Sequence, residues 1–272
     1  MQISLNTSKN HVKWYDRPWA AFIFFTRLPL WRIYEPHRDA YQSVVEYWPM
    51  VGWLSGGLMG AVLYACSLVM PYSIAVVMAI IARILLTGAL HEDGLADFID
   101  GFGAGGRNRL RILRIMKDSN IGTYGVLGLV FYVLLLYLIL SNMPPLIAAL
   151  SVLVADSYAK MIASQLIVML PYARTEEESK AHNVYRPMGV WAGIGLTIQG
   201  LLPMGIYLYF MQEFISWQYV VFIPCVVMYA LYLYINKKLR GYTGDCCGAV
   251  CLLVELCVLL TIILQLHPQL SS

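Results

Sequence analysis

The chain has 272 residues, of which 59% are hydrophobic and 13% are charged, and its net charge is +3. Soluble domains carry about 25% charged residues, so this chain has too few charged side chains to cover a globule in water. The composition excludes an ordinary soluble domain and predicts an all-α, polytopic transmembrane helix bundle. No linker or repeat divides the chain, so residues 1–272 are interpreted as one domain, and no nucleic-acid partner is expected.

The apolar stretches are taken in chain order. The first, residues 19–31, contains Arg27 and Pro29, which favours an interfacial or re-entrant helix over a span. A helix that crosses a bilayer needs about 20 mostly apolar residues. Seven later stretches meet this length: 48–70, 72–91, 123–141, 145–170, 189–211, 217–235 and 246–266. The sequence thus predicts about seven spans plus an N-terminal interfacial helix.

The basic residues predict the orientation of these spans. All 19 Lys and Arg residues except Arg83 and Lys160 fall in four segments, 1–47, 92–122, 171–188 and 236–245. The intervening turns carry none. By the positive-inside rule these four segments are cytoplasmic. An odd number of spans, with the N-terminus inside, satisfies every segment at once.

Four ionisable residues lie inside predicted spans: Arg83, Asp156, Lys160 and Glu255. Such groups are costly in a bilayer and usually face the interior of the bundle. Asp156 and Lys160 are one helical turn apart, so they are expected either to form an internal ion pair or to face a substrate. The sequence leaves both alternatives open.

An acidic cluster follows the second predicted span. His91, Asp93, Asp97 and Asp100 fall within ten residues. On a helix, the three aspartates would recur at i, i+4 and i+7 on one face, where like charges repel. A divalent cation would relieve that repulsion, and Mg²⁺ prefers oxygen ligands while leaving positions for phosphate oxygens. The alternative is a solvated acidic loop.

Basic and hydroxyl groups accompany this cluster. A glycine-rich stretch, 101–106, precedes a run of arginines, and arginine suits phosphate binding whereas glycine lets backbone approach a ligand. A lipid-facing basic stripe is the alternative for the arginines. The residues predicted to take part in a phosphate site are Arg114, Lys117, Asp118, Ser119, Thr243 and Asp245.

The central segment carries a long motif. It reads His-x-Asp-Gly-Leu-Ala-Asp-x-x-Asp-Gly over 91–101 and Ile-Met-Lys-Asp-Ser over 115–119. This motif resembles the cobalamin synthase family, the adenosylcobinamide-GDP ribazoletransferases. Shorter elements similar to family motifs follow the same order along the chain: 25–29, 48–52 and 243–249.

The resemblance implies a reaction and its participants. Adenosylcobinamide-GDP would be joined to α-ribazole or its 5′-phosphate with release of GMP. The protein would be multi-pass in the cell inner membrane, with active-site loops in the cytoplasm and the lipid bilayer as a partner; a homo-oligomer is left open. Displacement at a diphosphate needs a cation to offset charge, which supports Mg²⁺ as cofactor.

Roles follow for the site residues. Asp93, Asp97 and Asp100 are the predicted Mg²⁺ ligands, with Asp118 or Asp245 assisting. His91 is predicted as catalytic together with Asp93 and Asp97, because it titrates near neutral pH and can accept a hydroxyl proton; an orienting role is the alternative. Arg114, Lys117, Ser119 and Thr243 are the predicted substrate-binding residues.

One segment departs from the family pattern. Tyr172 and Arg174 resemble a family element, but residues 175–180 lack the glycines that follow it in the family, so Arg174 is carried over only weakly.

Two rival classes of protein remain. Intramembrane CDP-alcohol phosphotransferases and prenyltransferases also cluster aspartates around Mg²⁺, but 115–119 and 243–245 do not fit their patterns. A transporter would be expected to show inverted repeats, which this sequence lacks.

Overall fold

The computed structural model describes residues 12–174 and 185–270. Their ordered elements are helical, apart from one isolated parallel bridge between Tyr172 and Tyr242. The N-terminal elements are α1 (Asp16–Phe25) and the short 3₁₀ helices η1 (Leu30–Arg32) and η2 (Arg38–Tyr47). The longer elements are α2 (Trp48–Ser67), α3 (Tyr72–Thr87), α4 (Leu90–Ala104), α5 (Arg109–Lys117), α6 (Thr123–Ser141), α7 (Pro145–Met169), α8 (Val190–Met211), α9 (Trp217–Leu239) and α10 (Gly244–Leu270).

The predicted transmembrane bundle is confirmed. In the described part of the chain, six helical segments are long and apolar enough to cross a membrane: η2 with α2, α6, α7, α8, α9 and α10. The pair α3 and α4 counts as a seventh span only if the two are taken together, because their axes meet at 90°. One of the seven predicted spans is therefore broken.

The end of the second predicted span, 72–91, was placed too late. α3 ends at Thr87, and the next two residues take left-handed conformations, Gly88 with φ 65° and Ala89 with φ 58°. A side chain at Gly88 would collide with Arg27, whose backbone N–H donates to the carbonyl of Leu86 (2.7 Å). The N-terminal segment thus fills the bend. The predicted loop 92–122 forms α4 and α5 in large part, because the chain continues as helix after the bend.

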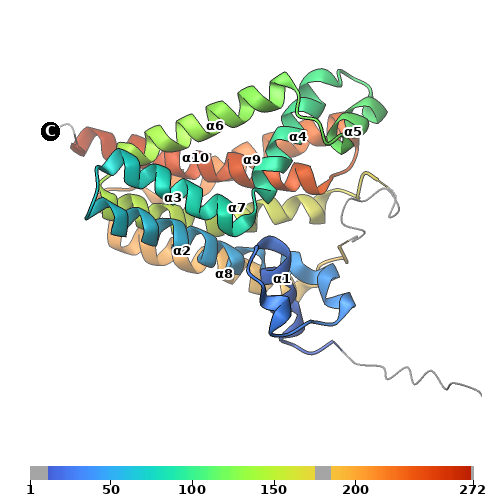
Figure 1. Ribbon diagram of the computed structural model, residues 1–272, viewed down its shortest axis with the longest axis horizontal. Coiled ribbons are helices and arrows are strands. Elements are labelled where there is room, and N and C mark those ends of the chain that lie inside the picture. The colour runs from blue at the N-terminus through green and yellow to red at the C-terminus, as the bar shows by residue number, and fades with distance from the viewer. Residues whose placement is uncertain (1–11, 175–184, 271–272) are drawn as a thin grey trace, which may run out of the picture.

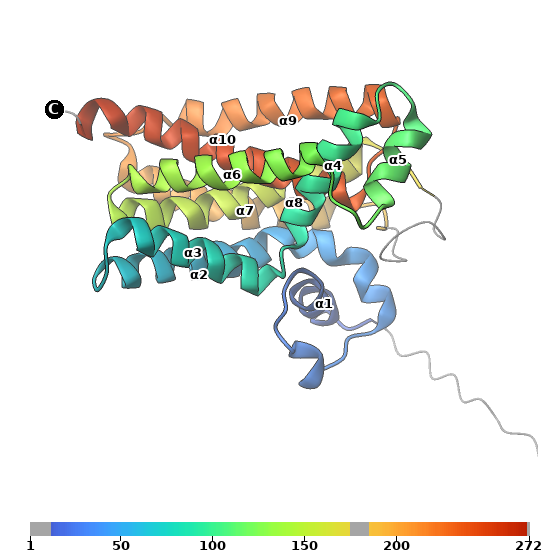
Figure 2. The ribbon, with the colours of Figure 1, turned by 45° about the horizontal axis from the view of Figure 1, so that its top comes forward.

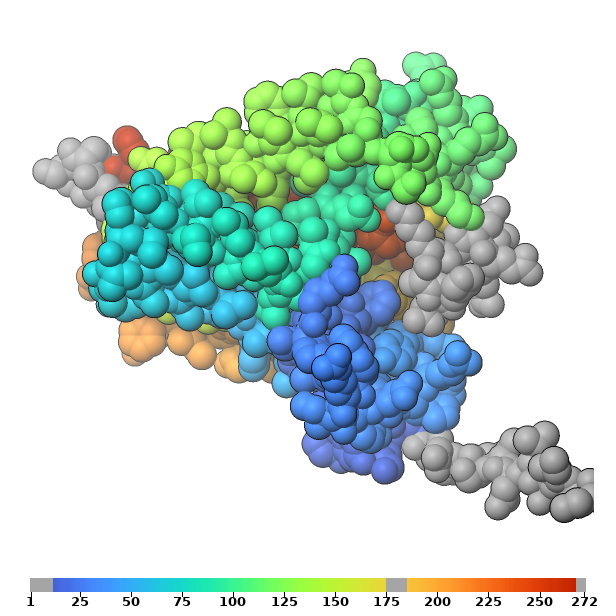
Figure 3. Space-filling model, in the orientation of Figure 1, coloured from blue at the N-terminus to red at the C-terminus, as the bar shows by residue number. Residues whose placement is uncertain are grey.

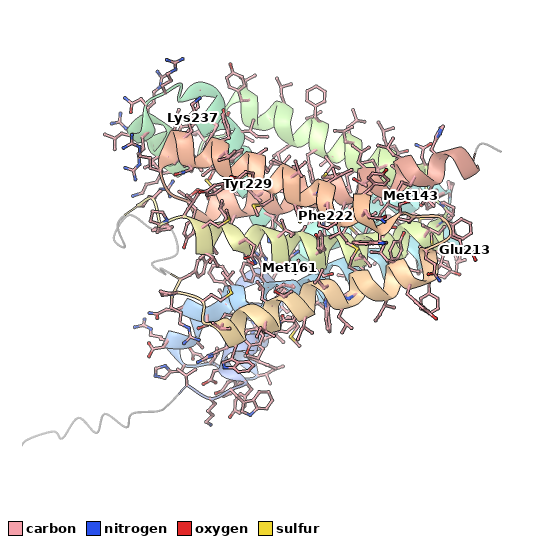
Figure 4. The ribbon with its side chains drawn as sticks, turned by 180° about the vertical axis from the view of Figure 1, so that it is seen from behind. Met143, Met161, Glu213, Phe222, Tyr229 and Lys237 are labelled. Atoms are coloured by element: carbon pink, nitrogen blue, oxygen red, sulfur yellow. The ribbon has the colours of Figure 1, made fainter. Side chains whose placement is uncertain are left out.

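The basic segments gather at one end of the bundle. η2, α4, α5, the residues that follow α7 and the turn between α9 and α10 all lie at that end, whereas the C-terminus lies at the other (Figures 1 and 2). Figure 4 shows Lys237 at the basic end and Glu213 and Met143 at the opposite end. The alternation of spans expected from the sequence is therefore present in the fold.

The N-terminal helix α1 does not cross the bundle. It has ten residues, a length of about 15 Å, and packs against η2 and α2 beside the basic end (Figure 2). The prediction of a non-spanning N-terminal helix is confirmed.

The centre of the bundle is the contact between α2 and α7. A Cβ on Gly52 would lie 2.7 Å from the Cα of Ser157, and one on Gly56 would lie 2.8 Å from the Cα of Leu153. These two glycines are one turn apart and let the helix backbones touch, as small residues do between membrane helices. They hold α7 at the centre of the bundle, where most of its residues are buried.

Two ion pairs lie inside the bundle. Asp156 pairs with Lys160 on α7, which confirms the first alternative for these residues, and the Ser55 hydroxyl also donates to Asp156. Arg83 on α3 pairs with Glu255 on α10, a contact that the sequence did not predict, and its guanidinium donates to the Tyr132 hydroxyl (2.8 Å). All four charged side chains are buried.

Candidate active site

A pocket of about 150 Å³ opens at the basic end of the bundle. We call it the first pocket. Its walls come from α1, the end of η2, the start of α2, the start of α4, the end of α7 with the residues that follow it, the segment before α8 and the start of α10. Figure 3 shows atoms of the α10 region, in red, at the floor of a recess between the green α4–α5 segment and the blue N-terminal segment. Its polar lining residues are His91, Asp93, Tyr172, Arg174, Tyr185 and Asp245.

Asp93 and Asp245 line the first pocket together, although they come from opposite parts of the sequence. α4 packs closely on the start of α10, where a Cβ on Gly94 would lie 3.2 Å from the Cα of Asp245. The close approach explains why glycine follows Asp93. The two sequence motifs, 91–101 and 243–249, thus build one site.

Thr243 is not among the residues that line this pocket, and its substrate-binding role stays a prediction. Its side chain is fully buried, and its hydroxyl accepts a hydrogen bond from the backbone N–H of Cys246 (3.3 Å). That is the N-cap interaction of a helix. Because Thr243 caps α10, Asp245 is not needed for that purpose.

Arg174 is a site residue that the sequence indicated only weakly. Its Nη2 lies 3.7 Å from Oδ2 of Asp245 and donates to the carbonyl of Leu113 (3.3 Å), and its side chain is 4% exposed. A buried guanidinium in a pocket with two carboxylates is a ready partner for a phosphate group. Residues 175–184, where the chain departs from the family pattern, lie outside the described residues.

Backbone contacts hold Arg174 in place. The N–H of Ala173 donates to the carbonyl of Tyr242 (2.8 Å), and the N–H of Tyr242 donates to that of Pro171 (2.9 Å). Arg109 donates to the carbonyls of both Ala173 (2.6 Å) and Leu239 (2.7 Å). The run of arginines after α4 is visible in the sequence. No sequence pattern predicts that Arg109 bonds to these two carbonyls, because they are distant from it along the chain.

His91 lies in the pocket wall in a stack of rings. It is 3% exposed and stacks with Trp48 and Phe25, with ring planes within 12° of parallel. Its Nε2 accepts a hydrogen bond from the indole N–H of Trp48 (3.3 Å). A ring nitrogen used in this way is not open to a substrate proton, so the geometry favours the orienting role over the catalytic base.

The aspartates of α4 have different surroundings. The segment is helical as predicted, but Asp100 is buried and its two oxygens accept the backbone N–H groups of Gly122 (2.7 Å) and Gly125 (2.9 Å). This carboxylate stabilises the N-terminus of α6, where its charge is favourable. These contacts favour a structural role for Asp100, and its metal role stays a prediction. Asp97, one turn after Asp93, lies outside the lining of the first pocket.

The remaining predicted residues lie away from the first pocket. Arg114 and Lys117 are exposed on α5, and Ser119 is exposed in the segment that follows. Asp118 accepts hydrogen bonds from the backbone N–H (3.0 Å) and side-chain amide (2.7 Å) of Asn120, and these bonds lower the pKa of its carboxyl group. The structure does not bring these four residues to Asp93.

Comparison with known proteins gives the family. The chain matches the family model described as cobalamin-5-phosphate synthase over residues 17–263. The chain belongs to this family. Among its curated relatives, the adenosylcobinamide-GDP ribazoletransferase of Leptospira interrogans is 32% identical over 87% of this chain and 90% of its own length. Those of Shewanella frigidimarina and Vibrio parahaemolyticus are each 34% identical over 89% of this chain and 92% and 90% of their own lengths. No solved structure matches.

The carboxylates of the first pocket in this cobalamin-5-phosphate synthase family member fit Mg²⁺ only in a binding mode that uses few protein ligands. Among residues 12–174 and 185–270, no three His, Cys, Asp or Glu side chains are grouped so that they could hold a metal ion. Mg²⁺ commonly binds through one or two carboxylates and completes its shell with water and substrate phosphates. Asp93 and Asp245 match that mode, and Asp93 is the exposed member of the pair.

Proposed function

We propose that this chain is a Mg²⁺-dependent adenosylcobinamide-GDP ribazoletransferase whose active site is the first pocket. The observation that carries the proposal is the meeting of Asp93, Asp245 and Arg174 in one pocket at the basic end of a membrane bundle. Two carboxylates and one guanidinium are what a diphosphate with a bound cation requires. Family membership and the names of the relatives support the same reaction.

The chemistry follows from that arrangement. A sugar hydroxyl of α-ribazole forms a bond to the phosphorus that carries the corrinoid, and the bond from this phosphorus to GMP breaks. Asp93 and Asp245 would hold Mg²⁺, which supplies positive charge beside the phosphoryl oxygens. Arg174 binds a non-bridging oxygen of the diphosphate and holds it in line with the hydroxyl, since positioning is a large part of catalysis for such displacements.

His91 acts as a positioning residue in this proposal. Its ring is held between Trp48 and Phe25, and it precedes Asp93 by two residues on the first turns of α4. The stack fixes the rotation of α4 and thereby the direction in which Asp93 points. The carboxylate of Asp93 has two oxygens, and the one that would not hold the cation is the group we assign to accept the proton of the attacking hydroxyl.

The proposed location is the inner membrane, with the first pocket on the cytoplasmic side. The four basic segments support this orientation, because the pocket lies at their end of the bundle. The nucleotide substrates reach the pocket from the cytoplasm, and the corrinoid stays outside, since a pocket of about 150 Å³ admits only its diphosphate arm.

The test is a reaction of the purified protein in detergent with adenosylcobinamide-GDP, α-ribazole and Mg²⁺. We expect release of GMP together with a corrinoid product that contains the ribazole, and no release when either substrate or Mg²⁺ is omitted. The matched control is the Arg174→Gln variant, which should keep the fold and lose most of the GMP release. A wild-type protein that is folded and releases no GMP would refute the assignment.

A further inference from the structure

A second pocket adjoins the first. It measures about 320 Å³ and shares Val45, Ile167, Tyr172 and Tyr185 with the first pocket. Its other walls come from η2, the end of α7, the residues before α8 and the turn between α9 and α10. The shared side chains form the boundary between the two pockets. A molecule in the second pocket therefore contacts them from one side, while Asp93 and Asp245 lie on the other.

The lining of the second pocket is mainly apolar and aromatic, and its polar members besides the tyrosines are Gln42, Ser43, Glu46 and Arg186. Tyr172, Tyr185 and Tyr242 contribute three phenol rings, and burial raises the pKa of Tyr185 and of Tyr242, so both stay neutral. Ile167, Val168, Leu170, Pro171, Pro187 and Met188 supply most of the remaining wall. Such a surface suits the flat face of an aromatic ring system.

One polar group in this lining has no partner. The hydroxyl of Ser43 is buried, with the residue 2% exposed, and no hydrogen bond reaches it from the described part of the chain. By contrast, the carboxylate of Glu46, which also lines the pocket, is already paired with Arg186 of the same lining (2.9 Å). An unsatisfied buried hydroxyl costs about 1 to 3 kcal/mol, so a native pocket that retains one is suited to a ligand that supplies the missing hydrogen bond.

Size and polarity reduce the choice of ligand. A corrinoid macrocycle does not fit in 320 Å³, a volume at the small end of ligand pockets. The smaller parts of the two substrates are the guanosine of one and the aromatic riboside of the other. Guanine has a polar edge that needs several hydrogen-bond partners. The charged groups of this lining, Glu46 and Arg186, are already paired with each other, so much of that edge would be left unpaired at high cost. An apolar bicyclic base has few hydrogen-bonding groups, so it can be buried there without leaving such groups unpaired.

We propose that the second pocket binds the acceptor, α-ribazole, with its bicyclic base among the tyrosines and a sugar hydroxyl bonded to Ser43. The proposal rests on the proposed function, which supplies the identity of the acceptor. The shared residues Tyr172 and Tyr185 place the sugar of such a ligand at the boundary with the first pocket, where Arg174 and Asp245 lie.

Two variants confined to the second pocket test the assignment. Ser43→Ala removes the hydroxyl, and the KM for α-ribazole should rise roughly 3- to 10-fold, the equivalent of one hydrogen bond. Met188→Trp fills the pocket, and the same KM should rise more than about 10-fold. In both variants the KM for adenosylcobinamide-GDP and the inhibition constant of GMP should stay within about twofold of wild type. Equilibrium dialysis of α-ribazole against the purified protein without corrinoid should show the same loss of affinity.

Matched controls exclude general effects of these changes. Ser141 also has a buried hydroxyl with no partner, but it ends α6 at the far end of the bundle, so Ser141→Ala should leave both KM values unchanged. Met78 is 42% exposed on α3, and Met78→Trp should likewise leave both KM values unchanged. Ser43→Ala should not lower the unfolding temperature, because it removes an unpaired polar group.

The outcomes separate the two proposals. An unchanged KM for α-ribazole in both variants, or a parallel rise for both substrates, overturns the assignment of the second pocket. A weaker inhibition by GMP with an unchanged acceptor KM assigns the pocket to guanosine and equally overturns it. A wild-type protein that binds α-ribazole in a Ser43-dependent way but releases no GMP supports the pocket and refutes the reaction.

Discussion

At the scale of single residues, the aspartates of α4 divide into two kinds. Asp93 lines the first pocket, and Asp100 accepts two backbone N–H groups at the start of α6. Sequence spacing alone put them on one face of a helix. The difference arises because α6 returns past the end of α4, which brings the N–H groups of Gly122 and Gly125 to Asp100.

This division predicts opposite phenotypes for two matched variants. Asp93→Asn should lower the rate of GMP release by roughly 100-fold or more and raise the Mg²⁺ concentration needed, while the unfolding temperature stays near wild type. Asp100→Asn should destabilise the protein by about 1 to 3 kcal/mol, because charged hydrogen bonds to N–H groups weaken, and keep its activity per folded molecule. Rates over a Mg²⁺ series and thermal unfolding in detergent measure both. An active Asp93→Asn variant at low Mg²⁺ would remove Asp93 from the metal site.

Asp245 allows a similar separation. Since Thr243 caps α10, Asp245→Asn should leave the helix intact. The variant should lose activity, and excess Mg²⁺ should restore part of it, because an amide is a poorer ligand than a carboxylate for a hard cation. Thr243→Ala is the contrasting change: it should cost about 1 kcal/mol of stability through the lost cap. If the Asp245→Asn variant had wild-type activity, Asp245 would not be a metal ligand, and the ligands would come from α4 alone.

At the scale of elements, the bend between α3 and α4 turns the chain by 90°, so that α4 packs on α10 and α6 and supplies part of the pocket wall. Two residues in left-handed conformations make it, Gly88 and Ala89. A left-handed conformation costs an L-residue other than glycine roughly 1 to 2 kcal/mol. The bend is thus stabilised by its surroundings, including the Arg27 contact, rather than by Ala89 itself.

Exchanging residue types at the bend should shift stability in opposite directions. Gly88→Ala adds backbone strain and a collision with Arg27, so the unfolding temperature should fall, by the equivalent of about 2 kcal/mol or more. Ala89→Gly removes strain at some cost in chain entropy and should raise the unfolding temperature slightly. Fluorescence-detected thermal unfolding of the purified variants measures the pair. A Gly88→Ala protein as stable as wild type would contradict the observed bend.

The elements show what the sequence could and could not predict. Apolar length located the spanning helices, because a bilayer imposes that length on any helix. It placed the end of α3 too late, since Ala89 and Leu90 continue the apolar pattern while the backbone turns at Gly88 and Ala89. Motifs identified Asp93 and Asp245 as site residues. They did not identify Arg109, whose role depends on two carbonyls that only the folded chain brings together.

At the scale of the whole molecule, the basic end and the opposite end should face different compartments. Asn108 lies in the exposed turn before α5 at the basic end, and Asn142 lies in the exposed turn after α6 at the other. In a variant without the six native cysteines, Asn142→Cys should react with a membrane-impermeant maleimide in intact cells. Asn108→Cys should react only after the membrane is opened. Strong labelling of position 108 in intact cells would reverse the orientation.

The two buried ion pairs differ in when they form during synthesis of the chain. Lys160 emerges from the ribosome four residues after Asp156 and neutralises it within one helix. Arg83 enters the membrane with α3, but its partner Glu255 is synthesised 172 residues later. An uncompensated arginine at the centre of a bilayer costs about 2.5 to 3.5 kcal/mol on insertion scales. Until the last helix is inserted, the nascent chain therefore carries an arginine whose carboxylate partner has not yet been made.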